Sequence, residues 1–329
     1  MGDHGAVPPM TIAVDPQAFS PCDSLYVSPH HDDVILSCGA RLLADAGRGL
    51  RILVVTVFGE GGRPWPDVGA LASADVRRVS LGLPDARQRT DYYSSFQALV
   101  EGRRDDDDRW VSQIAQALGE IAHRSKASQV YMPLGVGSHI DHRLSHEACL
   151  RGFQGGEGRN VFLYEERPEA FVRGAVRVRL GQVGARLPPA AIHAADRARL
   201  APFLWRFHLA PTLRGDLKGF TERLRSAGLA ARQWRQGKAW HPQKGFGPRL
   251  QPMVQPTDPA LLESVRQLQA ALAPTSGAAK RVARLSAAYA RRLGGSEHAE
   301  RFWLLLPPRE EGGITTVPDV DEPLPARAG

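Results

Sequence analysis

The chain has 329 residues, 43% of them hydrophobic and 23% charged, which is typical of a globular protein with a substantial core. No apolar run approaches the roughly 20 residues of a membrane span, and residues 1–10 lack the apolar segment of a signal peptide. The net charge of +7 fits a nucleic-acid partner, an anionic substrate or a bias towards arginine, but no nucleic-acid-binding motif accompanies it. The three cysteines show no paired spacing and so do not indicate a disulfide framework, which favours a cytoplasmic protein. From the preceding observations we expect no membrane span and no nucleic-acid partner.

The first part of the chain alternates short apolar runs with helical patterns. The strands that these runs predict are 25–27, 51–58, 130–132 and 160–164. The helices predicted between them are 33–46, 70–83 and 110–122. This alternation favours an α/β fold with a mostly parallel sheet.

After Pro168 the pattern changes. We expect a strand over 171–180, a loop over 240–256, and helices over 194–208, 217–236, 260–272 and 278–293. The predicted organisation is a catalytic α/β core over 20–190, a helical insertion or cap over 191–275, a helix and strand completing the core over 276–308, and a disordered tail over 309–329.

Two turns rich in histidine and aspartate follow predicted strands. Residues 30–33 read His-His-Asp-Asp and come directly after the strand 25–27, whereas residues 138–142 read Ser-His-Ile-Asp-His and follow the strand 130–132. An aspartate at the start of a helix can also act only as a cap. However, the carboxyl ends of parallel strands lie side by side and are where α/β folds bind ligands, so the joint occurrence indicates a metal or catalytic site.

These residues resemble the two signatures of the PIG-L (LmbE-like) zinc N-deacetylases. The first is Ser28-Pro29-His30-His31-Asp32-Asp33 with Cys38-Gly39-Ala40, and the second is His139-Ile140-Asp141-His142. The resemblance extends from about Leu25 to Glu165 and resumes over 295–303. His31 replaces a usual proline, and Val34 replaces a usual acidic residue, as in the branch that deacylates glycosylated secondary metabolites. The resemblance implies a Rossmann-like three-layer domain, with the helical C-terminal part as an insertion or cap.

The resemblance also implies one catalytic Zn²⁺ per chain, with another divalent metal possible. The ligands that it implies are His30, Asp33 and His142, a donor set that suits a zinc with one open position. It makes Asp32 the general base and gives His139 the stabilisation of the oxyanion or the protonation of the leaving group. We expect Asp141 to hold His139 or a ligand histidine in one tautomer.

Other residues are candidates for the substrate pocket or for structural roles. The pocket candidates are His31, Glu60, Arg63, Trp65 and Arg77. Glu60, Arg63 and Trp65 belong to the loop that leaves the strand 51–58, and an arginine near Arg77 can contact substrate in the family. His146, one helical turn beyond His142, is expected to be structural.

Taken together, these features predict a zinc-dependent N-deacetylase that releases an acyl group from an N-acyl amino sugar or glycosylated metabolite. A small N-acylated glycoside would be the substrate, and the oligomeric state is left open. One alternative is a metal-dependent phosphoesterase, because aspartates and histidines at strand ends also build two-metal sites. A second is a non-haem iron oxygenase using the His-x-Asp of residues 31–33, although such triads usually occur in all-β folds. A third is a non-enzymatic basic binding module.

Overall fold

The computed structural model describes residues 12–59, 69–153, 158–188, 191, 219–272 and 276–307. The strands are β1 (Ser24–Ser28), β2 (Ile52–Phe58), β3 (Val76–Leu83), β4 (Gln129–Pro133), β5 (Asn160–Tyr164), β6 (Arg249–Pro256) and β7 (Ala299–Leu306). The α-helices are α1 (Asp33–Gly47), α2 (Ala86–Arg89), α3 (Phe96–Glu101), α4 (Asp107–Ser125), α5 (Ile140–Gly152), α6 (Ala175–Gln182), α9 (Gly219–Ala239), α10 (Leu262–Leu272) and α11 (Ser276–Arg292). Short 3-10 turns are η1 (Pro16–Phe19), η2 (Gly69–Ala72), η3 (Asp91–Ser94), η4 (Glu169–Phe171) and η7 (Pro259–Leu261).

The described part of the chain is organised around one sheet of seven strands, in the order β3-β2-β1-β4-β5-β7-β6. The strands β3 to β5 are parallel, β7 runs antiparallel to β5, and β6 runs antiparallel to β7. The chain leaves β1 towards β2 on one side, while β4 pairs with β1 on the other. The order therefore reverses between β1 and β4, which is the place where open α/β sheets bind ligands.

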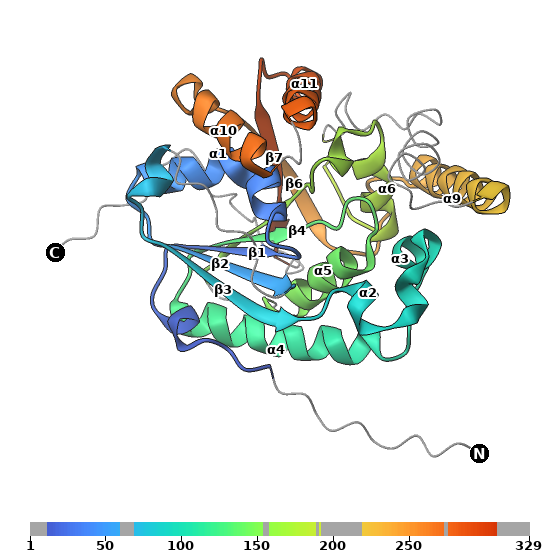
Figure 1. Ribbon diagram of the computed structural model, residues 1–329, viewed down its shortest axis with the longest axis horizontal. Helices are drawn as coiled ribbons and strands as arrows, with labels where there is room; N and C mark the ends of the chain where they lie inside the picture. The colour runs from blue at the N-terminus through green and yellow to red at the C-terminus, as the bar shows by residue number, and fades with distance from the viewer. Residues whose placement is uncertain are drawn as a thin grey trace.

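Helices cover both faces of this sheet. In Figure 1, α1 and α10 lie on one face, and α4 and α5 lie on the other. Leu53 of β2 belongs to the core that includes Ile114 of α4, whereas Val54 belongs to the core that includes Leu42 of α1. A strand buried on both faces needs a continuous apolar run rather than an alternation. The predicted three-layer α/β architecture with a mostly parallel sheet is confirmed.

Residues 76–83 form a strand, so the predicted helix over 70–83 is wrong. Val79, Leu81 and Leu83 are buried in β3, whereas Ser80 and Gly82 between them are exposed. This period of two is typical of a strand with one buried face. Among the strands of the described residues it pairs with β2 alone, so it forms one edge of the sheet.

Two further local predictions are wrong for different reasons. The alternation of Val176, Val178 and Leu180 with arginines predicts a strand, but these residues lie in α6. In α6 the arginines are also engaged, because Arg179 donates to the carbonyl of Leu134 at 2.8 Å. The prolines of 240–256 predict a loop, but 249–256 is β6. As the last strand of the sheet, β6 tolerates proline.

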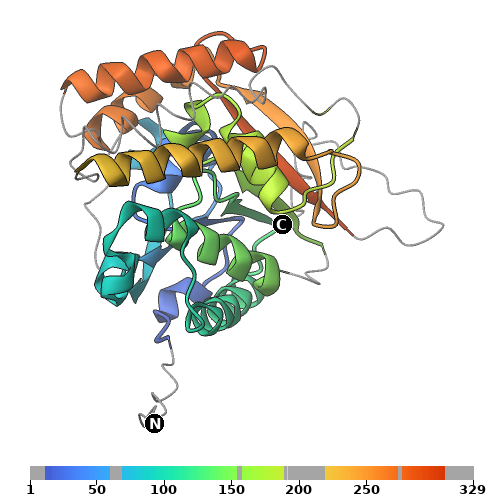
Figure 2. The same ribbon diagram turned by 90° about the vertical axis from the view of Figure 1, so that its right-hand side faces the viewer.

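The division into a core, an insertion and a completing segment stays a prediction. Within the described part of 191–275, β6 joins the main sheet, while α9 packs against α6 and crosses the view of Figure 2. The predicted helix over 194–208 and the predicted tail over 309–329 lie outside the described residues. No helix in the described ranges combines the length and apolarity that a membrane span requires.

Candidate metal centre and active site

The two histidine-bearing turns meet at the carboxyl ends of β1 and β4. These strands are parallel neighbours, and Leu25 of β1 is paired with Val130 of β4. The turn 29–32 leads from β1 into α1, and the loop 134–139 leads from β4 into α5. As a result, the rings of His30 and His142 lie with their centroids 5.3 Å apart although they are remote in sequence.

A carboxylate lies between these two imidazoles. Oδ2 of Asp33 is 3.4 Å from Nδ1 of His30 and 3.4 Å from Nε2 of His142. The potential ligand atoms of the three residues all lie within 4.8 Å of one another. His30, Asp33 and His142 can therefore supply two nitrogens and one oxygen to a single cation.

Local hydrogen bonds shape the turn that carries the first two of these residues. Asp33 is the first residue of α1, and its Oδ2 accepts the N–H of His30 at 2.8 Å. The hydroxyl of Ser28 donates to the carbonyl of His30 and accepts the N–H of Val34. A negative side chain is favoured at a helix N-terminus, so the sequence Ser-Pro-His-His-Asp-Asp folds locally into this arrangement.

The outward nitrogen of each imidazole faces a second carboxylate. Nε2 of His30 is 3.2 Å from Oδ2 of Asp141, and Nδ1 of His142 is 3.6 Å from Oε1 of Glu166. Carboxylates in these positions select the tautomer of a ligand histidine and leave its other nitrogen free for the metal. Asp141 therefore orients the candidate ligand His30 more directly than it orients His139, whose Nδ1 is 3.9 Å away.

Asp141 is itself held in place by an ion pair and a hydrogen bond that the sequence analysis missed. Nη1 of Arg89 is 2.6 Å from Oδ1 of Asp141, and the N–H of Ala86 donates to Oδ2 at 3.0 Å. The guanidinium of Arg89 lies over the ring of Phe58, with 4.7 Å to the centroid. No sequence signal points to Arg89, because it lies on the short helix α2, far along the chain from both motifs.

Glu166 was also not assigned a role from the sequence. It follows β5, the parallel neighbour of β4, and it accepts the N–H groups of Gly135 at 2.5 Å and Val136 at 2.8 Å. One buried carboxylate thus contacts His142 and shapes the loop that leads to His139. The signal was present, since a carboxylate at the end of a third parallel strand reaches the same edge of the sheet.

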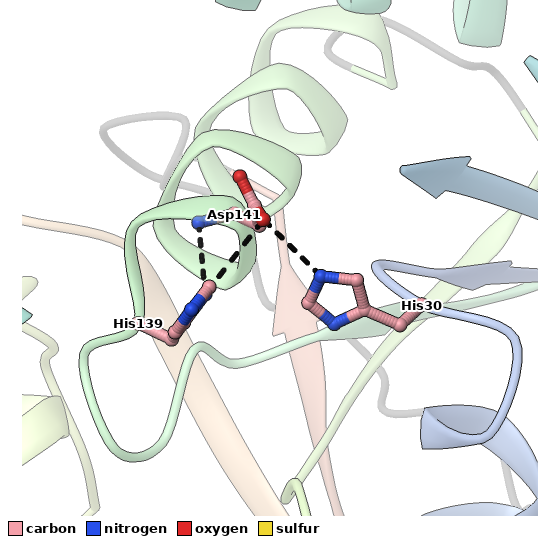
Figure 3. A group of neighbouring side chains, drawn as sticks. All are labelled: His30, His139 and Asp141. Carbon is pink, nitrogen blue, oxygen red and sulfur yellow. Dashed lines mark hydrogen bonds and ion pairs between the residues drawn. The ribbon is translucent and has the colours of Figure 1, made fainter. Parts of the chain in front are cut away.

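His139 lies at the N-cap of α5, beside the candidate ligands. Its Nδ1 accepts the N–H of Asp141 at 3.3 Å, so in the neutral ring the proton is on Nε2. Figure 3 shows His139 and His30 on either side of Asp141. Burial lowers the pKa of His139 to about 3. A neutral imidazole with an Nε2–H is a hydrogen-bond donor, which suits the stabilisation of a developing negative charge. His30, His139 and Asp141 also form a second group that could hold a cation.

Asp32 occupies the N-cap position of α1 but does not cap the helix with its side chain. Only its main-chain carbonyl is engaged there, accepting the N–H of Leu36 at 3.0 Å. The interpretation of Asp32 as a simple helix cap is therefore not supported. Its partly buried carboxylate is adjacent to the ligand candidate Asp33.

The carboxylates make the centre a site for positive charge. Burial opposes a charged His30, but Asp141 and Asp33 outweigh it and raise its pKa to about 10. In the same way Asp33 and Glu166 outweigh burial and raise the pKa of His142 to about 9. Burial favours the neutral form of Asp33, yet His142 and His30 hold its pKa well below the usual range. A divalent cation would satisfy these carboxylates once the imidazoles lose their protons, and two imidazoles with a carboxylate are a donor set that fits zinc.

The other pocket candidates are placed as follows. His31 lies in the turn between β1 and α1 and is partly buried. Glu60, Arg63 and Trp65 lie outside the described residues. The prediction for Arg77 requires a correction. Arg77 lies near the amino end of β3, whereas the site lies at the carboxyl ends of the strands. Its side chain donates to the carbonyls of Gln17, Ser20 and Pro21. The predicted helix would have left Arg77 free to reach the pocket, whereas the strand directs it to the N-terminal segment.

These pKa shifts predict how the stability of the metal-free protein depends on pH. His30 and His142 stay protonated in the folded state while an unfolded histidine loses its proton near 6.5, so folding gains stability below 6.5 and loses it as pH rises towards 9 to 10. We expect the free energy of unfolding to fall between about pH 6.5 and 8.5, by on the order of 1 kcal/mol per group and pH unit. Urea unfolding of the chelator-treated protein measures this.

The double variant His30→Ala/His142→Ala is the control for this pH dependence. It removes both raised pKa values, so its stability should change little over the same interval. An equally steep fall in the double variant would contradict the assignment to these two residues.

No family model matches the chain. Among curated proteins, 2'-N-acetylparomamine deacetylase of Streptomyces fradiae is 35% identical over 175 residues, which cover 47% of this chain and 60% of that protein. The match thus spans less than two thirds of the relative's length. Two solved structures share the fold: the zinc-inhibited form of teicoplanin deacetylase, at TM-score 0.50 and 19% identity, and A40926 pseudoaglycone deacetylase, at TM-score 0.50 and 15% identity. Each of these matches covers 86% of this chain and 97% of the other.

Proposed function

We propose that the chain belongs to the PIG-L (LmbE-like) N-deacetylases and that it hydrolyses the amide of an N-acylated amino sugar with the help of one bound zinc; its two motifs and the deacetylase relative support this. The observation that supports this most is the convergence of His30, Asp33 and His142 around one point at the switch point of the sheet. An α/β sheet does not suit the alternative of an iron oxygenase, whose triads belong to all-β folds.

The same geometry supports a set of metal ligands within this proposal. His30 would bind through Nδ1 and His142 through Nε2, because the other nitrogen of each ring faces Asp141 or Glu166. Asp33 would supply the single carboxylate oxygen. When bound, zinc would polarise the acyl carbonyl and make a water molecule more acidic. Asp141 is already engaged by the ion pair with Arg89 and the N–H of Ala86, which favours one metal over the two that a phosphoesterase would use.

The remaining chemistry belongs to Asp32 and His139. The carboxylate of Asp32, which is not consumed by helix capping, would accept a proton from the attacking water and pass it to the departing amine. The Nε2–H of His139 would donate to the carbonyl oxygen as it gains negative charge. This role needs a neutral imidazole, and burial keeps the pKa of His139 low. Because a neutral imidazole is a poor acid, His139 is better suited to stabilising the oxyanion than to protonating the leaving group.

We infer an amino sugar as the part of the substrate that carries the acyl group. The support is the relative of Streptomyces fradiae, which is a deacetylase of 2'-N-acetylparomamine. A second and independent hint is the valine at position 34, the variant that resembles the branch acting on glycosylated secondary metabolites.

The proposal is tested by measuring free-amine release from a panel of N-acetylated glycosides, with N-acetylated aminoglycoside precursors and simple N-acetyl sugars as separate arms. We expect release from at least one arm, its loss after treatment with a chelator, and its return when zinc is restored. Metal analysis of the same preparation should give about one zinc per chain. Release that survives complete metal removal would refute a metal-dependent mechanism.

A further inference from the structure

The stretch 295–303, which the sequence analysis singled out, takes no part in the chemistry proposed above. It contains the first five of the eight residues of β7, which lies between β5 and β6 in the sheet. Its polar residues His298, Glu300 and Arg301 are nevertheless buried. Buried charges need partners, and Glu300 finds its partners on α1, the helix that begins with the candidate ligand Asp33.

Glu300 binds the middle of α1. The helix is interrupted at Cys38, whose φ of −123° and ψ of 17° are not helical. Beyond the interruption, Oε1 of Glu300 accepts the N–H of Ala40 at 2.8 Å, and Oε2 accepts the N–H of Arg41 at 2.9 Å. Glu300 therefore acts as an N-terminal cap for the second half of α1, supplied by a strand that is remote in sequence.

The interruption separates the site from the part of α1 that is anchored to the sheet. The second half is held by Asp45, which accepts hydrogen bonds from Ser24 at 3.0 Å and Tyr26 at 2.6 Å, both in β1. The first half, from Asp33 to Ser37, follows Asp32 directly. Cys38 thus lies between this anchored half and the turn that presents Asp32 and Asp33.

The same stretch reaches the first half of α1 by a second route. The hydroxyl of Ser37 accepts the N–H of Arg167 at 3.1 Å, and the guanidinium of Arg167 is 2.8 Å from Nε2 of His298. Arg167 also follows Glu166, the carboxylate next to His142. Both halves of α1 are therefore connected to residues 298–300, one through Glu300 and one through His298.

We propose that Glu300 is a positioning residue of the metal centre, which fixes the bend of α1 so that Asp33 meets His30 and His142. This inference rests on the proposed function for its relevance to catalysis, but its consequence for metal binding stands by itself. The carboxylate offers an acceptor to each of two N–H groups. An amide offers only one acceptor, and its NH₂ group would face the other N–H.

The test compares Glu300→Gln with Asp45→Asn, which alters a buried carboxylate on the same helix but beyond the interruption. We expect Glu300→Gln to bind zinc at least about 10-fold more weakly in competition with a chromophoric chelator, as for other residues that orient metal ligands. Its Co²⁺-loaded form should show an altered visible spectrum. Asp45→Asn should lose stability but bind zinc within about twofold of wild type, with an unchanged Co²⁺ spectrum.

Kinetics separate this inference from the proposed function. On any substrate that the wild type deacetylates, Glu300→Gln should lower kcat about 10-fold with little change in KM. If the wild type binds zinc but releases no amine, the proposed function fails while the zinc and Co²⁺ measurements still decide the role of Glu300. Wild-type zinc affinity and spectrum in a destabilised Glu300→Gln would overturn the inference.

A second variant covers the case in which Glu300→Gln does not fold. Glu300→Asp keeps the charge but is shorter by one methylene, so it cannot reach both N–H groups without moving the bend. We expect Glu300→Asp to bind zinc more weakly than the wild type, in which the longer glutamate reaches both N–H groups. Unchanged zinc affinity in a folded Glu300→Asp would overturn the inference.

Discussion

Asp32→Asn is expected to abolish amine release while the protein keeps its zinc. The amide cannot accept the proton of the attacking water, and loss of a general base lowers kcat by about 10²- to 10⁴-fold. Asp32 neither caps α1 with its side chain nor belongs to the candidate ligand group, so zinc content should stay at about one per chain. Steady-state kinetics and metal analysis on the same preparation measure the two quantities.

The adjacent residue provides a matched control for this variant. Asp33→Asn changes the neighbouring carboxylate in the same way, but Oδ2 of Asp33 is 3.4 Å from the nearest nitrogen of both His30 and His142. We expect Asp33→Asn to lose zinc and activity together, whereas Asp32→Asn loses activity alone. An active Asp32→Asn enzyme would show that another group is the base.

His142→Ala is expected to remove metal binding and, with it, the stabilisation that zinc gives to the fold. A ligand that binds only the folded state raises its stability according to its concentration relative to Kd, so the increase in Tm on adding zinc reports the site directly. In the wild type we expect a clear increase. In His142→Ala the increase should be lost and amine release should fall at least about 10²-fold.

The control is His146→Ala, one turn further along α5. Nδ1 of His146 is 2.9 Å from the carbonyl of Pro133, and burial lowers its pKa to about 3. Removing this neutral, buried ring should lower the Tm of the metal-free protein through lost packing and a lost hydrogen bond. The increase in Tm on adding zinc should nevertheless persist. If both variants respond to zinc alike, His142 is not a ligand.

The position of the centre could be predicted from the sequence because it depends on local features. A strand, a proline, a polar turn and a helix follow one another at residues 25–46 and again at 130–150, and parallel strands place such turns at one edge. Glu166 carried the same signal after the strand 160–164. Prediction failed at β3, because two local patterns competed there. Residues 76–83 show the period of two of a strand, but they lie inside the longer stretch 70–83 that was expected to be helical.

The sequence by itself determined the α/β layering, the pair of strand ends that carry the site, and the residue types that can bind a metal there, because hydrophobic periodicity and strand-turn-helix order are local properties of the chain. Only the tertiary structure decided that Asp141 faces His30 at 3.2 Å, that Arg89 anchors Asp141, and that Glu300 caps the bend of α1. These partners are far apart along the chain. Their contacts arise from the way the layers pack, and buried charges must then find donors wherever packing brings them.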